Sequence, residues 1–147
     1  TAALAASQIT DAEIAEIAAM VDDIARENRD PRGTDRADRS FHLAIARASR
    51  NSGMLGAVTT LWGLRESSAE AALLHAKART ANIKPVVEEH TAILQALKAR
   101  DPAAARAAMR AHLSAVLDSL LFATEEQAVA EARKAAEAKR ARYKGAD

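Results

Sequence analysis

The chain has 147 residues, of which 49% are hydrophobic, a formal net charge of +1 and no cysteine. This length suits one ordinary domain with a substantial core. The lack of cysteine excludes a disulfide framework, a thiolate zinc site and a cysteine nucleophile. Acidic and basic residues are interspersed, which argues against a standing DNA-binding surface. Because no long uncharged apolar run and no signal peptide are visible, we expect a cytoplasmic protein without a membrane span.

The composition favours helices throughout. Aromatic residues make up only 3% of the chain, which has five glycines and three prolines. Alternating polar and apolar segments are almost absent, so the pattern indicates closely packed α-helices and not strands. We therefore predict an all-α fold, an antiparallel bundle of six or seven helices that close around one centre.

The first clear helix begins at a capping box formed by Thr10 and Glu13. Its apolar residues share one face and are Ile14, Ile17, Val21 and Ile24. The residues 28–34 interrupt this helix. The next helix is expected from about Asp35 to Ser49.

A turn at residues 51–53 leads to a long predicted helix over residues 54–79, which Gly63 would bend. A loop near Asn82 separates it from two final helices. The first of these has apolar residues at helical spacing, namely Val86, Val87, Ile93, Leu94 and Leu97. Asp101 and the proline after it supply an N-cap and a first-turn residue for the second. Because the connection is short, these two helices are expected to be antiparallel neighbours.

Four polar side chains are expected to meet inside the bundle. His90 lies eleven residues before Asp101 and His112 eleven after it, so both lie about 16 Å from the turn. Asp38 and His42 are four residues apart on one helical face. A single histidine on an apolar face is more often a hydrogen-bonded core residue than a metal ligand. Three imidazoles and a carboxylate, however, are buried most economically around a shared cation.

Two segments carry a resemblance to a known family. "DRSFHLAIARASRN" and "EEHTAILQALKARDPAAARAAMRAHL" resemble the FCD domain, the effector-binding module of FadR-type regulators in the GntR superfamily of bacterial transcription factors. The family's pattern is D-x3-H in one helix, then a helix that opens with E-H and continues I-L-x-A-L, then G/R-D-x3-A-x6-H-L in the last core helix. The resemblance covers about residues 1–122. It implies that the metal ligands are Asp38, His42, His90 and His112.

The resemblance also predicts the domain organisation. Residues 1–122 are expected to form an FCD-type metal- and effector-binding bundle, and residues 123–147 a C-terminal extension rich in alanine and charged residues. Because alanine is its main apolar residue, the extension is expected to project, fray or pack on a partner subunit. Its basic end is interpreted as a solvated helix face. Whole regulators of this kind carry an N-terminal winged-helix domain, for which there is no room before Thr10, so we expect an excised effector domain.

The ligand set limits the choice of metal. Three imidazoles and one carboxylate suit Zn²⁺, Ni²⁺, Mn²⁺ or Co²⁺, with zinc as the first expectation. Open coordination positions would be filled by water or by oxygens of an incoming ligand, and the resemblance implies that this ligand is a small organic acid. A guanidinium can bind such an acid bidentately. The candidate effector-binding residues are Arg65, Thr59, Trp62 and Asn51.

Each of these candidates also has a plainer interpretation. Arg65 shares a helical stripe with Val58 and Leu61 and is expected to point partly inward, but it could be an ordinary surface arginine. Trp62 could be a core residue, and Asn51 a turn and cap residue. Arg79 lies about 21 Å further along the helix and is too remote. His75 matches no ligand position and is interpreted as structural or exposed.

We therefore predict a ligand-sensing and dimerisation domain of a GntR-type regulator that contacts DNA only through another domain. Effector binding would bias helix packing at a homodimer interface and so change the spacing of the DNA-binding domains. The alternative is a metal-dependent hydrolase or oxygenase whose metal is held by three histidines and one aspartate. No separate general base is evident, because Glu88 and Glu89 are rotated off the stripe of His90, although Glu89 is a candidate partner for a ligand. A third interpretation is a purely structural metal.

Overall fold

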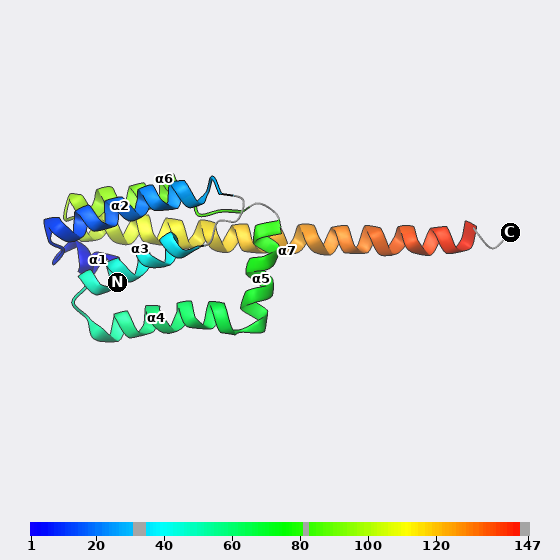
Figure 1. Cartoon of the computed structure of the whole chain (residues 1–147), viewed down its shortest axis with the longest axis horizontal. Helices are drawn as coiled ribbons and strands as arrows, with labels where there is room; N and C mark the ends of the chain where they lie inside the picture. The colour runs from blue at the N-terminus through cyan, green and yellow to red at the C-terminus, as the bar shows by residue number, and fades with distance from the viewer. Residues whose placement is uncertain (31–34, 81–82, 145–147) are drawn as a thin grey trace.

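The computed structural model describes residues 1–30, 35–80 and 83–144, with the backbone alone at a few positions of the fifth and last helices that include His75 and Arg79. Within these ranges the chain forms helices and no strand, which confirms the all-α prediction. The seven helices (Figure 1) are α1 (Ala2–Ala6), α2 (Asp11–Glu27), α3 (Arg36–Ala48), α4 (Ser52–Ser67), α5 (Ala69–Thr80), α6 (Val87–Lys98) and α7 (Pro102–Lys144).

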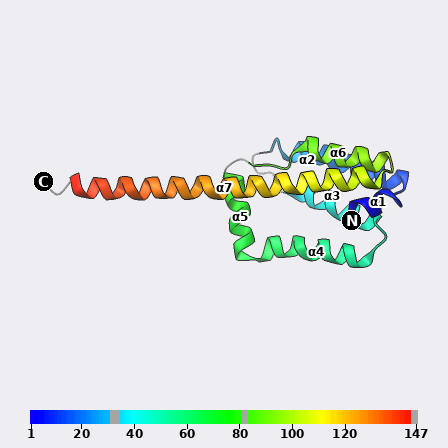
Figure 2. The same ribbon diagram turned by 180° about the vertical axis from the view of Figure 1, so that it is seen from behind.

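The bundle packs on the first half of α7. Helix α6 lies against this half and α1 crosses its beginning, whereas α2 packs on α6 and α3 (Figures 1 and 2). Helix α4 lies apart and contacts only α3 and α5 among the described helices. Helix α5 runs steeply back from the end of α4 to the middle of α7. Beyond that point α7 continues alone, so the predicted extension is continuous with the last helix of the bundle.

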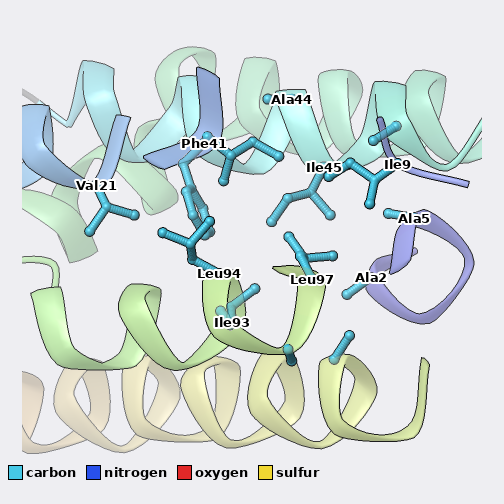
Figure 3. Close-up of a cluster of buried hydrophobic side chains, with 14 of the residues drawn as sticks. Ala2, Ala5, Ile9, Val21, Phe41, Ala44, Ile45, Ile93, Leu94 and Leu97 are labelled. Atoms are coloured by element: carbon cyan, nitrogen blue, oxygen red, sulfur yellow. The ribbon is translucent and has the colours of Figure 1, made fainter. Parts of the chain in front are cut away.

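The core lies between α1, α2, α3 and α6. Phe41, Ile45, Leu94 and Leu97 point into it from two facing helices (Figure 3). Helix α1 contributes only small residues to this core, Ala2, Ala5 and Ala6 being buried. Small side chains let the short helix lie close against its neighbours.

Local signals explain where several helices begin. The Thr10 hydroxyl accepts a hydrogen bond from the Glu13 amide at 3.3 Å, and the Glu13 carboxylate accepts one from the Thr10 amide at 2.9 Å. This capping box confirms the predicted start of α2. The Arg50 guanidinium binds the same carboxylate with both terminal nitrogens, which lowers the pKa of Glu13.

The long helix expected over residues 54–79 is two helices. The prediction of a bend at Gly63 was wrong, because α4 runs through this residue and ends at Ser67. At Ser68 the backbone is extended, with a ψ of 129°. Its hydroxyl accepts a hydrogen bond from the Ala71 amide at 3.3 Å, so Ser68 caps α5. The predicted loop near Asn82 lies outside the described residues, as does part of the break after α2.

Among the described residues, no helix combines the length and the apolar character that crossing a bilayer requires.

Candidate metal centre

The four predicted ligands meet at one place in the bundle. One ligand atom each of Asp38, His42, His90 and His112 lies within 4.8 Å of the other three. The Asp38 Oδ1 atom is 2.9 Å from His90 Nε2 and 3.3 Å from His42 Nε2. His42 Nε2 is 3.3 Å from His112 Nε2. Atoms about 2.1 Å from one metal ion lie about 3.0 to 3.4 Å apart at ordinary coordination angles, so these separations suit a shared cation.

Local geometry brings the ligands together. Asp38 and His42 lie one turn apart on α3, with Phe41 between them pointing into the core. The Asp101 carboxylate accepts hydrogen bonds from the amides of residues 103 and 104, at 2.9 and 3.0 Å, and so starts α7 directly after α6. As predicted, His90 and His112 then face each other across this hairpin, with ring centroids 4.6 Å apart.

The centre is shielded from water on most sides. His90 is 0% exposed, His112 3% and Asp38 8%. The Phe41 ring packs edge-on against His90, with centroids 4.9 Å apart. Burial of this kind strengthens electrostatic interactions, so an anion here requires a close positive partner.

Two of the imidazoles are oriented by outer hydrogen bonds. His90 Nδ1 donates to the Val86 carbonyl oxygen at 2.7 Å, and His112 Nδ1 donates to a Glu89 carboxylate oxygen at 2.8 Å. Because a carbonyl oxygen only accepts, the His90 proton is on Nδ1, which leaves Nε2 as the nitrogen that faces the centre. This arrangement is typical of metal-binding histidines. Glu89, considered in the sequence as a partner of a ligand, is therefore in contact with one.

The charges of the centre are coupled. Burial by itself would raise the pKa of Asp38, but hydrogen bonds from His42 and His90 outweigh it and hold that pKa well below its usual value. Burial would lower the pKa of His90, yet the contact with Asp38 raises it overall. For His112, burial prevails and its pKa is lowered, against the opposing effect of Glu89. The centre thus holds a carboxylate anion beside imidazoles of unequal basicity.

Arg65 reaches the edge of this centre from α4. Its guanidinium lies over the Trp62 ring, with Cζ 4.5 Å from the ring centroid, and pairs with Asp35. Its Nη1 atom is 3.8 Å from Asp38 Oδ2, whereas His90 contacts the other carboxylate oxygen, Oδ1. An arginine therefore lies beside the candidate metal centre, within reach of a small ligand placed there.

A cavity opens between α4 and the bundle on this side. Its volume is about 500 Å³, and it is lined by residues of α1, α3, α4 and α7 that include His42, Trp62, Arg65 and His112. A smaller cavity of about 80 Å³ reaches Asp38 and His112 from the other side and is lined by Asp35, Lys84 and Glu89 among others. Small-molecule sites usually have volumes of about 300 to 1,000 Å³, so the larger cavity has the right size for a ligand.

Comparison with known proteins shows the family of the chain. The FCD domain matches residues 1–115, well over half of the chain. This chain belongs to the FCD domain family.

This FCD domain is also similar to parts of three transcriptional regulators. It is 36% identical over 105 residues to the Putative L-lactate dehydrogenase operon regulatory protein of Escherichia coli (strain K12), covering 69% of this chain and 39% of that protein. It is 33% identical over 128 residues to the HTH-type transcriptional regulator LutR of Bacillus subtilis (strain 168), covering 85% and 58%. It is 31% identical over 114 residues to the Exu regulon transcriptional regulator of Escherichia coli (strain K12), covering 76% and 43%.

The chain therefore spans between 39% and 58% of the length of these relatives. All three are named as regulators, so the family and the relatives place the chain among regulatory domains of the GntR type and not among enzymes.

Other predicted residues of the FCD domain lie further from the centre. Thr59 is exposed and does not line the larger cavity. Asn51 caps α4, since its side-chain oxygen accepts a hydrogen bond from the Met54 amide at 3.0 Å. The side chains of His75 and Arg79 lie outside the described part of the chain.

Sequence reasoning missed two residues near the centre. Asp35 pairs with Arg65, and Lys84 lines the smaller cavity while its Nζ atom donates to the Asn28 carbonyl oxygen at 2.6 Å. Asp35 precedes α3 by one residue and was interpreted only as the beginning of a helix. Its position three residues before Asp38 was the one signal that it lies near the same centre.

Proposed function

We propose that this FCD domain is the sensing domain of a transcriptional regulator, that it binds a divalent metal, and that a small organic acid binds at that metal. The metal ligands are Asp38, His42, His90 and His112. The observation that carries the proposal is the convergence of these four side chains from α3, α6 and α7. Zinc is the first candidate, with nickel, manganese and cobalt as alternatives for the same ligand types.

The chemistry of the centre favours a metal over a network of protons. His90 Nδ1 already donates to a carbonyl, so its contact with Asp38 requires either a second proton on the ring or a cation between the two atoms. A charged imidazole with 0% exposure, beside two further imidazoles, is costly. One divalent cation would neutralise Asp38 and satisfy all three facing nitrogens together.

The surroundings of the centre support an acidic effector. When bound, the metal would supply positive charge and open coordination positions to a carboxylate. Arg65 would hold the far end of the ligand, exchanging its contact with Asp35 for the incoming acid. The ring of Trp62 supplies one wall of the cavity. One relative is named for the operon of L-lactate dehydrogenase, an enzyme of a small organic acid, which supports this class of effector.

The same contacts suggest how binding would be transmitted. Helix α4 has no buried residue and approaches the centre through Arg65 and Trp62. A ligand bridging Arg65 and the metal would fix α4 relative to α3 and α7, which shifts the population of helix arrangements. In a cytoplasmic homodimer, this shift would alter the spacing of DNA-binding domains that the whole regulator carries elsewhere.

The effector is tested by calorimetric titration of metal-loaded protein with a panel of small mono- and dicarboxylic acids. At least one acid is expected to bind, and Arg65→Ala is expected to weaken it by about tenfold or more, since a charge-assisted contact is lost. Arg47→Ala, on an exposed position of α3, is the matched control and should leave the affinity unchanged. Binding of no acid, or equal affinity in both variants, would contradict the proposed effector site.

A further inference from the structure

The second half of α7 leaves the bundle as a lone helix (Figures 1 and 2). Between Glu125 and Arg140 the described side chains are exposed, except that of Gln127, which is partly buried. Helices that are rich in alanine are only marginally stable on their own, and most helices in proteins are stabilised by packing on another element. From Glu125 to Arg140 the helix therefore has no partner in the described chain, whereas just before it Ala123 is buried where α7 packs on α5.

The charges of this segment are sorted along its length. From residue 117 to 132 it has acidic residues and no basic one, whereas from 133 to 140 it has four basic residues and one acidic residue. The acidic block is Asp118, Glu125, Glu126 and Glu131, and the basic block is Arg133, Lys134, Lys139 and Arg140.

Only part of this charge pattern can stabilise a single helix: Glu131, Arg133, Lys134 and Arg140 each have an opposite charge three or four residues away, and the other four charged residues of the blocks do not. Opposite charges three or four residues apart stabilise a single helix. Glu125, Glu126 and Lys139 have no opposite charge at either spacing. Within the described part of the chain, none of the eight charged residues of the two blocks forms an ion pair. Their charges are thus available to a second helix.

One face of the same segment carries apolar residues interspersed with charged ones. Phe122, Val129, Ala132 and Ala136 recur at helical spacing and share this face with Asp118, Glu125 and Lys139. Phe122 is 59% exposed and Val129 47%. A stripe that combines two larger residues with alanines allows a second helix to approach closely.

We propose that two copies of the chain pair through residues 118–140 of α7 in antiparallel orientation, with the two-fold axis near Ala132. In this register Glu125 and Glu126 lie level with Arg140 and Lys139 of the second copy, on or beside the shared face. Glu131 and Lys134 also lie level with each other, but on the far side of the helix. Val129 then lies level with Ala136 of the second copy, so the apolar stripe is covered too. A parallel pair would instead place acidic block against acidic block and basic against basic, which is repulsive.

The pairing goes beyond the homodimer of the proposed function and rests on no metal or effector. The partner of this segment is a second copy of the chain, because the acidic block of one copy is complementary in charge to the basic block of the other. Paired in this way, the two bundles lie at opposite ends of a rod of two helices. The pairing therefore adds a contact that is separate from any interface made by the bundles.

The test is sedimentation equilibrium of the full chain at low salt. The wild-type chain should self-associate. Reversal of the basic block (Arg133→Glu, Lys134→Glu, Lys139→Glu, Arg140→Glu) should raise the dissociation constant at least about tenfold. A second variant reverses the acidic block (Glu125→Lys, Glu126→Lys, Glu131→Lys), and an equimolar mixture of the two should associate again. A matched control reverses four exposed basic residues elsewhere: Arg47, Lys98, Arg106 and Arg110.

Orientation is tested by single cysteines, since the chain has none of its own. Ala132→Cys should form a disulfide between two copies, because residue 132 lies near the two-fold axis. Val129→Cys alone should not, because its two copies are about 10 Å apart along the axis. A mixture of Val129→Cys and Ala136→Cys should cross-link.

Each outcome decides the proposal. A monomeric wild-type chain overturns both this pairing and the homodimer of the proposed function. A dimer with the same dissociation constant in the wild type and the basic-block variant overturns only the pairing through α7. Cross-linking of Val129→Cys with itself overturns the antiparallel orientation.

Discussion

Replacement of Glu89 by alanine tests the candidate metal centre without removing a ligand. The Glu89 carboxylate accepts the Nδ1 hydrogen of His112 at 2.8 Å and so orients this buried ring from outside the centre. Loss of such an outer partner usually weakens metal binding by about 10- to 100-fold, or about 1.4 to 2.8 kcal/mol. The pKa of His112 is lowered by burial, so near pH 7.5 this ring is neutral and competition with protons contributes little.

The assay is competition of the protein for Zn²⁺ with a chromophoric chelator near pH 7.5. Glu88→Ala is the matched control, because Glu88 is the exposed neighbouring residue of the same type on α6. Glu89→Gln, which keeps an acceptor oxygen but not the charge, should fall between the two. If Glu89→Ala binds zinc as tightly as Glu88→Ala does, the inferred role of the Glu89–His112 contact is refuted.

Three further predictions concern stability and pH. Phe41→Ala removes a ring with 0% exposure that packs on His90, so the free energy of unfolding should fall by about 3 to 5 kcal/mol in chemical denaturation; a loss below about 1 kcal/mol would contradict this packing. Thr10→Ala breaks the capping box of α2 and should cost about 1 kcal/mol in the same assay, whereas an unchanged midpoint would mean that the cap contributes nothing. The contact with Asp38 raises the pKa of His90. At pH values below this pKa the metal must displace a proton from the ring. The apparent metal affinity should therefore fall about tenfold per pH unit for each displaced proton. An affinity that stays constant from pH 8 to pH 5.5 would speak against His90 as a ligand.

Much of the fold was predictable because its signals are local. The capping box at Thr10 and the Asp101–Pro102 start of α7 each depend on residues within one turn, and both are present. Equal spacing from Asp101 was enough to place His90 and His112 at one height, since a short hairpin leaves little freedom. The i, i+4 spacing on α3 was enough to place Asp38 and His42 on one face of that helix.

The surroundings of the centre were harder to predict, because they depend on how α4 lies. Periodicity put Arg65 on an inward stripe, but α4 has no buried residue, so its rotation is set by a few tertiary contacts. Thr59 accordingly lies outside the cavity that Trp62 and Arg65 line. The pairing of Arg65 with Asp35 joins residues thirty positions apart and has no local signal.

The break at Ser68 was missed for a different reason. A serine is tolerated inside a helix and also caps one, and the sequence around Ser68 fits both. The bend was predicted at Gly63 because glycine is a weaker helix former than serine. A side chain at this position would meet nothing within 4 Å, so Gly63 lies at an open surface of the helix. The turn is fixed instead by α5, which has to run back from α4 to α7.

Metal content tests most directly whether one divalent metal is held by three imidazoles and one carboxylate. After purification without chelators, elemental analysis should find about one transition-metal ion per chain. His90→Ala and His112→Ala should lose the metal, whereas His75→Ala, at the remaining histidine outside the proposed set, should keep it. A wild-type chain without stoichiometric metal, or a metal retained equally in all three variants, would contradict the account.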